Sequence, residues 1–200
     1  MSPRYFNDRE NKFRDWWKEL HGIEEYGKKR NMRGERAHLR RAETPGDVML
    51  SSAYYALFYR LPPERSLKVK TMAVAIIAGI LSHIENEVTE KKEDDPQKRP
   101  TFAKQLGSPK EQGDNKPVMS ELRFQKLAKS NTPEEFYRLL IRAVKMLGKT
   151  VHISSLVDNI YHWVTEHHYG KDQRPENRLV VQWAGDYFEA LSKIENKKEK

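Results

Sequence analysis

The feature that most constrains the fold is an uninterrupted apolar run near the middle of the chain, MAVAIIAGIL at residues 72–81. It is too short to cross a bilayer, which takes about 20 apolar residues. A helix over residues 66–89 places Met72, Ile76 and Ile80 on a wide apolar face. We therefore expect this helix to be buried and to form the centre of the molecule.

The rest of the chain also has helical periodicity, and the alternation and hairpin turns typical of strands are missing. The clearest case is residues 133–147, where Phe136, Leu139, Leu140, Ala143 and Val144 repeat at helical spacing. The sequence predicts an all-α fold, a bundle of about seven to nine helices in two packed halves. The expected helices cover residues 8–20, 45–61, 66–89, 120–130 and 133–147, with one between the first two that holds the basic stretch from Glu35 and stops at Thr44-Pro45. A further helix lies around 153–164, and a last one runs from 175 or 176 into the tail.

Proline and charge distribution divide the chain into three parts. Residues 1–90 form an N-terminal helical half, and residues 119–200 form a C-terminal helical half with a frayed tail. Residues 91–118 are polar and contain Pro96, Pro100, Pro109 and Pro117, a composition typical of a loop or linker. Within it, residues 101–107 are predicted to form one or two helical turns.

Two Thr-Pro pairs mark helix starts. Thr44 is suited to cap the helix that begins at Pro45, with Asp47 three residues after the cap. Thr132 and Pro133 repeat the arrangement, and there Glu135 is expected to complete a capping box.

The charge balance indicates the kind of partner. The formal net charge is +8 and the chain has no cysteine. The missing thiols exclude disulfides, thiolate catalysis and cysteine-based zinc sites, and they fit a reducing cytoplasm. The polar N-terminal segment lacks the apolar core of a signal peptide. A basic excess favours a polyanionic partner, and nucleic acid is favoured over an acidic membrane surface.

The basic residues form stripes on three predicted helices. Each residue of a helix is rotated by about 100° from the one before it, so residues three or four positions apart lie on the same face. Each stripe lies opposite an apolar face. One such stripe is also what any amphipathic helix needs for a solvated surface. Three stripes with little acid between them favour contacts with phosphates, to which arginine is well suited. The candidate residues are Arg33, Arg36 and Arg40 with Arg41 beside them, then Arg123, Lys126 and Lys129, and finally Arg138, Arg142 and Lys145.

Other candidate sites are weaker. No glycine-rich phosphate loop or helix-turn-helix signature is present, so backbone tracking is favoured over base reading. His162 with Glu166, or the pair His167–His168, suggests a metal only weakly without an HExxH motif. No nucleophile elbow, kinase motif set or convincing carboxylate pair appears; Asp94 and Asp95 fall in the predicted loop. We expect no enzyme activity, cofactor or metal.

The aromatic residues allow two interpretations. Tyr54, Tyr55, Phe58 and Tyr59 lie close together on one predicted helix. Such rings can stack on bases, but their place on an apolar helix favours core packing. Trp163 and Trp183 are also expected in the core.

Several segments taken in order resemble the CasB family, the small subunit of the type I-E CRISPR surveillance complex Cascade. They are RAHLRRAETPGDVMLSSAYYALFYRLP, the TFAKQLG segment, SELRFQKLAKSNTPEEFYRLLIRAVKMLGKTVHISSLVDNIYHWV and RLVVQWAGDYFEAL. The resemblance covers roughly residues 36–191. By position, Arg40 and Arg41 match the family's Arg-Arg pair, Arg123 its Arg-Phe arginine, and Arg138 a basic position.

The resemblance implies an all-helical, non-enzymatic subunit of a prokaryotic antiviral complex in the cytoplasm. Its implied partners are the other Cascade subunits and guide RNA, the target and displaced DNA strands, and a second copy of itself, without a membrane. Guide–target pairing then reads the sequence, and the protein needs only backbone contacts. The alternative is a basic helical adaptor that binds an acidic protein surface and no nucleic acid.

Overall fold

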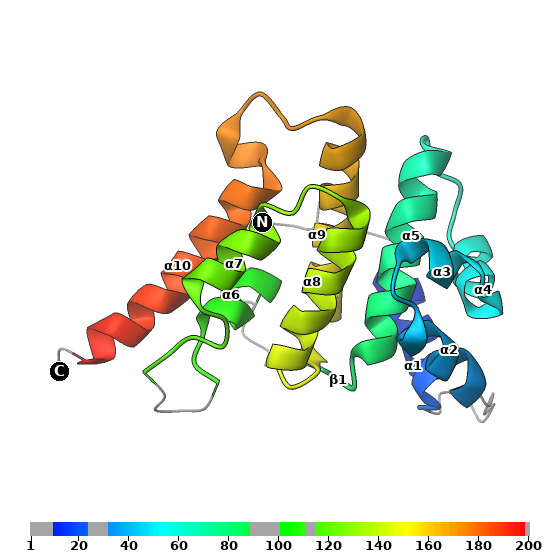
Figure 1. Cartoon of the computed structure of the whole chain (residues 1–200), viewed down its shortest axis with the longest axis horizontal. Helices are drawn as coiled ribbons and strands as arrows, with labels where there is room; N and C mark the ends of the chain where they lie inside the picture. Colours follow the sequence, from blue (N-terminus) through cyan, green and yellow to red (C-terminus); the bar gives the residue numbers. More distant parts are fainter. Residues whose placement is uncertain (1–9, 24–31, 89–100, 111–114, 199–200) are drawn as a thin grey trace.

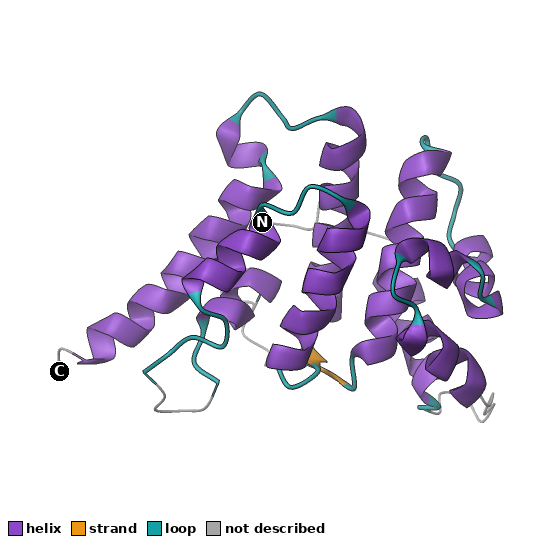
Figure 2. Ribbon diagram, in the orientation of Figure 1, coloured by secondary structure: helices purple, strands orange, loops and turns teal. Residues whose placement is uncertain are grey.

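The computed structural model describes residues 10–23, 32–88, 101–110 and 115–198, and this part of the chain confirms the predicted all-α class. Helices dominate, and two very short strands join them (Figure 2). The elements are α1 (Glu10–His21), α2 (Arg33–Arg41), α3 (Pro45–Met49), α4 (Ser52–Arg60), α5 (Leu67–His83), β1 (Asn86–Glu87), α6 (Phe102–Gly107), α7 (Glu121–Ala128), α8 (Pro133–Met146), β2 (Thr150–Val151), α9 (Ile153–Tyr169), the 3-10 turn η2 (Pro175–Asn177) and α10 (Leu179–Lys198).

Helix α5 is the central element, as its apolar sequence predicts. Every residue from Ala73 to His83 is buried. Helices α1 to α4 pack against one side of α5, and α8 and α9 pack against the other (Figure 1). Helices α6, α7 and α10 lie beyond α8 and α9. The helical surfaces thus meet in one continuous core.

Helix α6 packs closely on α10, and this contact depends on a glycine. A Cβ atom added to Gly107 would lie 2.4 Å from the carbonyl oxygen of Tyr187 and 3.2 Å from the Cβ of Ala190. The Tyr187 ring stacks on Phe124 of α7, with centroids 4.1 Å apart. Its hydroxyl donates a hydrogen bond to the carbonyl of Met119 at 2.7 Å. These contacts fix α6 and α7 onto α10.

The prediction of a single helix over residues 45–61 is wrong, because α3 ends at Met49 and α4 begins at Ser52. Ser51 has an extended backbone, and its hydroxyl accepts a hydrogen bond from the amide of Tyr54 at 3.1 Å. It therefore caps a new helix. The break turns Leu50 outward, where it is 81% exposed instead of lying in the core.

The helix expected over 66–89 is also shorter than predicted. Helix α5 ends at His83, and β1 then pairs in parallel with β2, Asn86 opposite Thr150 and Glu87 opposite Val151. The expectation that the chain has no strands is therefore wrong, because β1 and β2, each two residues long, form a pair. Its partners are far apart in sequence and too short to show alternation, so no local pattern marks them.

The two Thr-Pro caps are present, with one difference. At α3 the box is complete: Thr44 Oγ1 accepts from the Asp47 amide at 3.2 Å, and the Asp47 carboxylate accepts from the Thr44 amide at 2.9 Å. At α8, Thr132 accepts from the Glu135 amide, but the Glu135 carboxylate accepts from the amide of Asn131 instead of Thr132. Ser120 precedes α7 without a side-chain capping bond.

Replacing Thr44 with alanine should lower the free energy of unfolding by about 1–2 kcal/mol, the usual cost of losing such a cap. The change removes the acceptor for the Asp47 amide and one donor to its carboxylate. Urea denaturation measures the effect. Ser52→Ala is the matched control, because Ser52 is exposed at the first position of α4. Equal stabilities of the two variants would contradict the capping role.

Candidate nucleic-acid interface

The three helices predicted to carry basic stripes lie on the same side of the molecule. In Figure 1, α7 lies in front of α10, α8 in front of α9, and α2 in front of α1. On α8, Phe136, Leu140 and Val144 are buried, which turns the opposite, basic face outward. On α7 the stacked Phe124 faces α10, so its basic face also points away from the core.

Nine of the ten predicted basic residues are exposed on these helices or at their ends. The tenth, Arg36, is half-buried. The exposed set is Arg33, Arg40, Arg41, Arg123, Lys126, Lys129, Arg138, Arg142 and Lys145.

Arg36 is anchored to the end of α5. Its Nε donates to the carbonyl oxygen of Ser82 at 3.3 Å. Burial lowers the pKa of Arg36, and the neighbouring Arg40 lowers it further. Arg36 thus joins α2 to α5, a contact that stripe geometry alone could not predict.

Basic residues from α2 and from the end of α8 act on His83, at the end of α5. The His83 side chain is buried, and its Nε2 has no hydrogen-bond partner among the described residues. Burial lowers the pKa of His83 to about 4, and the positive charges of Arg40, Lys145, Arg36 and Lys149 act in the same direction. Cations from two helices therefore produce one joint field here.

One carboxylate partly balances this region. Glu85 pairs with Lys149, with 2.6 Å between Oε1 and Nζ. That hydrogen bond, together with the nearby cations, lowers the pKa of Glu85. No acidic partner of Arg40 or Lys145 is found within the described ranges.

The aromatic cluster on α4 divides between core and surface. Tyr54 is buried, and Phe58 packs partly against the core. Tyr55 and Tyr59 are 47% and 77% exposed, and their rings stack with centroids 6.0 Å apart. Core packing is therefore wrong for these two tyrosines, because each follows a core-facing residue by one position and so lies about 100° away from it around α4. Trp163 and Trp183 are buried, as expected.

The histidines near the end of α9 have structural partners. His162 Nε2 lies 3.2 Å from Glu166 Oε1, and the same carboxylate oxygen accepts from the amide of Leu179 at 2.9 Å. Glu166 thus joins α9 to the start of α10. The described residues contain no cluster of three or more His, Asp or Glu suited to a metal ion; Asp94 and Asp95 lie outside them. No described helix is both long enough and apolar enough to cross a membrane.

The buried histidines should make stability depend on acid. The folded-state pKa values of His21 and His83 are lowered to about 4, chiefly by burial. The unfolded chain therefore binds more protons between about pH 6.5 and pH 4. The free energy of unfolding should fall as the pH falls through this window, by about 2 kcal/mol for His83 after discounting for solvent screening.

Urea unfolding at stepped pH measures this dependence. His83→Gln should flatten the curve, whereas the exposed His168→Gln should leave it unchanged. A parent curve that is level over the window would contradict buried, neutral histidines.

A comparison with protein families identifies a related family. The family model described as CRISPR-associated protein Cse2 matches residues 35–188. This range covers α7, α8, α9 and most of α2, and it excludes Arg33. No curated protein and no solved structure matches the chain.

Proposed function

The chain belongs to the CRISPR-associated Cse2 family, the small subunit of the type I-E Cascade complex in CRISPR defence, and on that premise we propose how it acts there. Its basic side would hold nucleic-acid backbone without regard to sequence. It would thereby stabilise the guide–target hybrid and the displaced strand. The family is a non-catalytic one, and we propose no reaction for this chain.

The observation that carries the proposal is that α2, α7 and α8 lie on one side of the molecule and that each exposes basic residues (Figure 1). Their exposed arginines and lysines come from segments far apart in the sequence. Exposed cations spread along one side suit a polyanion better than a single acidic side chain. Binding of this kind releases counterions and weakens steeply with salt.

The arrangement also suggests where the backbone contact is strongest. Arg40 and Lys145 both act on the buried His83, and among the described residues Glu85 is the carboxylate on which the charge of Arg40 also acts. Arginine makes paired hydrogen bonds to phosphate oxygens, and lysine adds a point charge. Neither contact distinguishes one base from another.

We further propose the remaining partners. Guide RNA and the other Cascade subunits would be bound in the prokaryotic cytoplasm, together with a second copy of this chain. Base pairing between guide and target would supply the sequence recognition.

Purification of the tagged chain from its native cells tests the proposed assembly. Mass spectrometry and RNA sequencing should find the other Cascade subunits together with guide RNA. The alternative function, an adaptor for an acidic protein, predicts a protein partner that remains after nuclease treatment and no guide RNA. That second result would overturn the proposal.

A further inference from the structure

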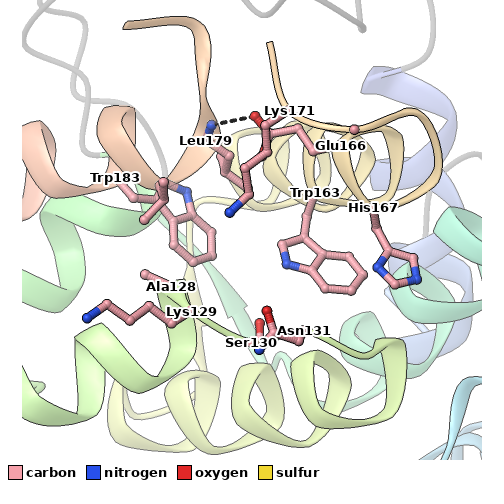
Figure 3. A pocket seen from close by; sticks show the side chains of 12 residues that line it. Ala128, Lys129, Ser130, Asn131, Trp163, Glu166, His167, Lys171, Leu179 and Trp183 are labelled. Atoms are coloured by element: carbon pink, nitrogen blue, oxygen red, sulfur yellow. Dashed lines mark hydrogen bonds between the residues drawn. The ribbon is translucent and has the colours of Figure 1, made fainter. Parts of the chain in front are cut away.

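A cavity of about 280 Å³ lies where the α7–α8 loop, the end of α9 and the start of α10 meet. Its walls combine two indole rings with cationic and polar side chains (Figure 3). The lining includes Lys129, Asn131, Trp163, His167, Lys171 and Trp183.

The apolar part of the cavity is rigid. Trp163 stacks on Phe136 with centroids 4.2 Å apart, and His167 stacks on Trp163 at 4.9 Å. The indole nitrogen of Trp183 donates to Asn159 Oδ1 at 2.8 Å, which holds the second ring. Because Phe136 and His167 already stack on Trp163, a guest would meet the edge of that indole and not its face. Both indoles are fixed in advance, so little ordering would accompany its binding.

The polar part of the cavity is rich in donors. The ammonium group of Lys171 points into the space between the two indoles, and the indole N–H of Trp163 borders the same space (Figure 3). The carboxylate of Glu166 is held by His162 and by the Leu179 amide, and the positive charge of Lys171 helps to lower its pKa. A suitable guest therefore carries hydrogen-bond acceptors and negative charge.

The cavity is continuous with the proposed backbone surface through Lys129. This residue is exposed at the end of the α7 stripe and also lines the cavity. A strand that follows Arg123 and Lys126 along α7 would reach the cavity with its next phosphate. The volume is too large for a carboxylate alone and lies near the lower limit of small-molecule sites.

We propose that this cavity binds one nucleotide of the bound strand, with its base against the N–H edge of Trp163 and beside Trp183, and its phosphate near Lys129 and Lys171. The inference rests on the proposed nucleic-acid binding and adds a place where a base leaves the stack. Acceptors on any base would meet Lys171 and the Trp163 N–H, so the site would tolerate sequence variation.

The test is an NMR titration of the full chain with adenosine 5′-monophosphate, followed through the indole N–H signals. The signals of Trp163 and Trp183 should shift, while those of Trp16 and Trp17, which lie on α1, should not. Ribose 5-phosphate and succinate, which lack a base, should bind at least tenfold more weakly. Lys171→Glu should weaken nucleotide binding about tenfold, because it removes a charged donor.

Lys116→Glu is the matched control, since it makes the same charge change at an exposed residue outside the cavity. Unchanged indole signals at saturating nucleotide would overturn the inference, as would equal binding of ribose 5-phosphate or succinate. If the cavity inference fails in either way but the chain still binds oligonucleotides, the backbone proposal is unaffected. If the unmodified chain does not bind oligonucleotides at all, the backbone proposal itself is refuted.

Discussion

Reversing two charges, Arg40→Glu together with Lys145→Glu, should weaken binding of single-stranded DNA by tenfold or more. These residues belong to the α2 and α8 stripes, and their charges both act on the buried His83. Each lost phosphate contact should also reduce the slope of log affinity against log salt by about 1. Fluorescence anisotropy with a labelled oligonucleotide measures both quantities.

The control for this variant is Lys110→Glu with Lys116→Glu, which makes the same total charge change at exposed residues of another loop. It should lose much less affinity, because only the long-range field changes. Equal losses in the two double variants would show that net charge alone governs binding. Both doubles should keep parental stability, since exposed substitutions usually change it by less than about 0.5 kcal/mol.

Replacing Gly107 with alanine should destabilise the protein by about 3 kcal/mol. The added methyl group would overlap the backbone carbonyl of Tyr187, 2.4 Å from the ideal Cβ position. A carbonyl within α10 cannot rotate away as a flexible side chain can, so α6 and α10 would have to separate. For a chain of this size, the melting temperature should fall by several degrees.

Gly34→Ala provides the opposite control. Gly34 lies within α2, and a Cβ there would meet no atom within 4 Å. Alanine should therefore stabilise the helix, by about 0.5–1 kcal/mol. If Gly107→Ala and Gly34→Ala change the unfolding free energy in the same direction, the close α6–α10 contact is wrong.

The sequence was sufficient for features that depend on neighbouring residues. The burial of α5 follows from its apolar run, and the caps at Thr44 and Thr132 follow from residue types at fixed spacing. The break at Ser51 was missed because apolar residues continue on both sides of it and hide the cap. The β1–β2 pair was missed because it joins distant segments.

The candidate site, too, could be predicted from the sequence only in part. Helical spacing was enough to predict which basic residues share a face on each helix. That charges from α2 and α8 both act on His83, and that Arg36 bonds to Ser82, depends on how these helices pack on α5. The cavity had no sequence signal at all, because Asn131, Lys171 and Trp183 come from three separate segments and form no motif.

The central claim is that this subunit binds nucleic-acid backbone through charge and without reading sequence. The most direct measurement is the affinity of the unmodified chain for two unrelated single strands of equal length, titrated from about 50 to about 300 mM salt. The account predicts two superimposable straight lines in a plot of log affinity against log salt, falling steeply. Affinity that differs strongly between the strands, or no binding at the lowest salt, would contradict it.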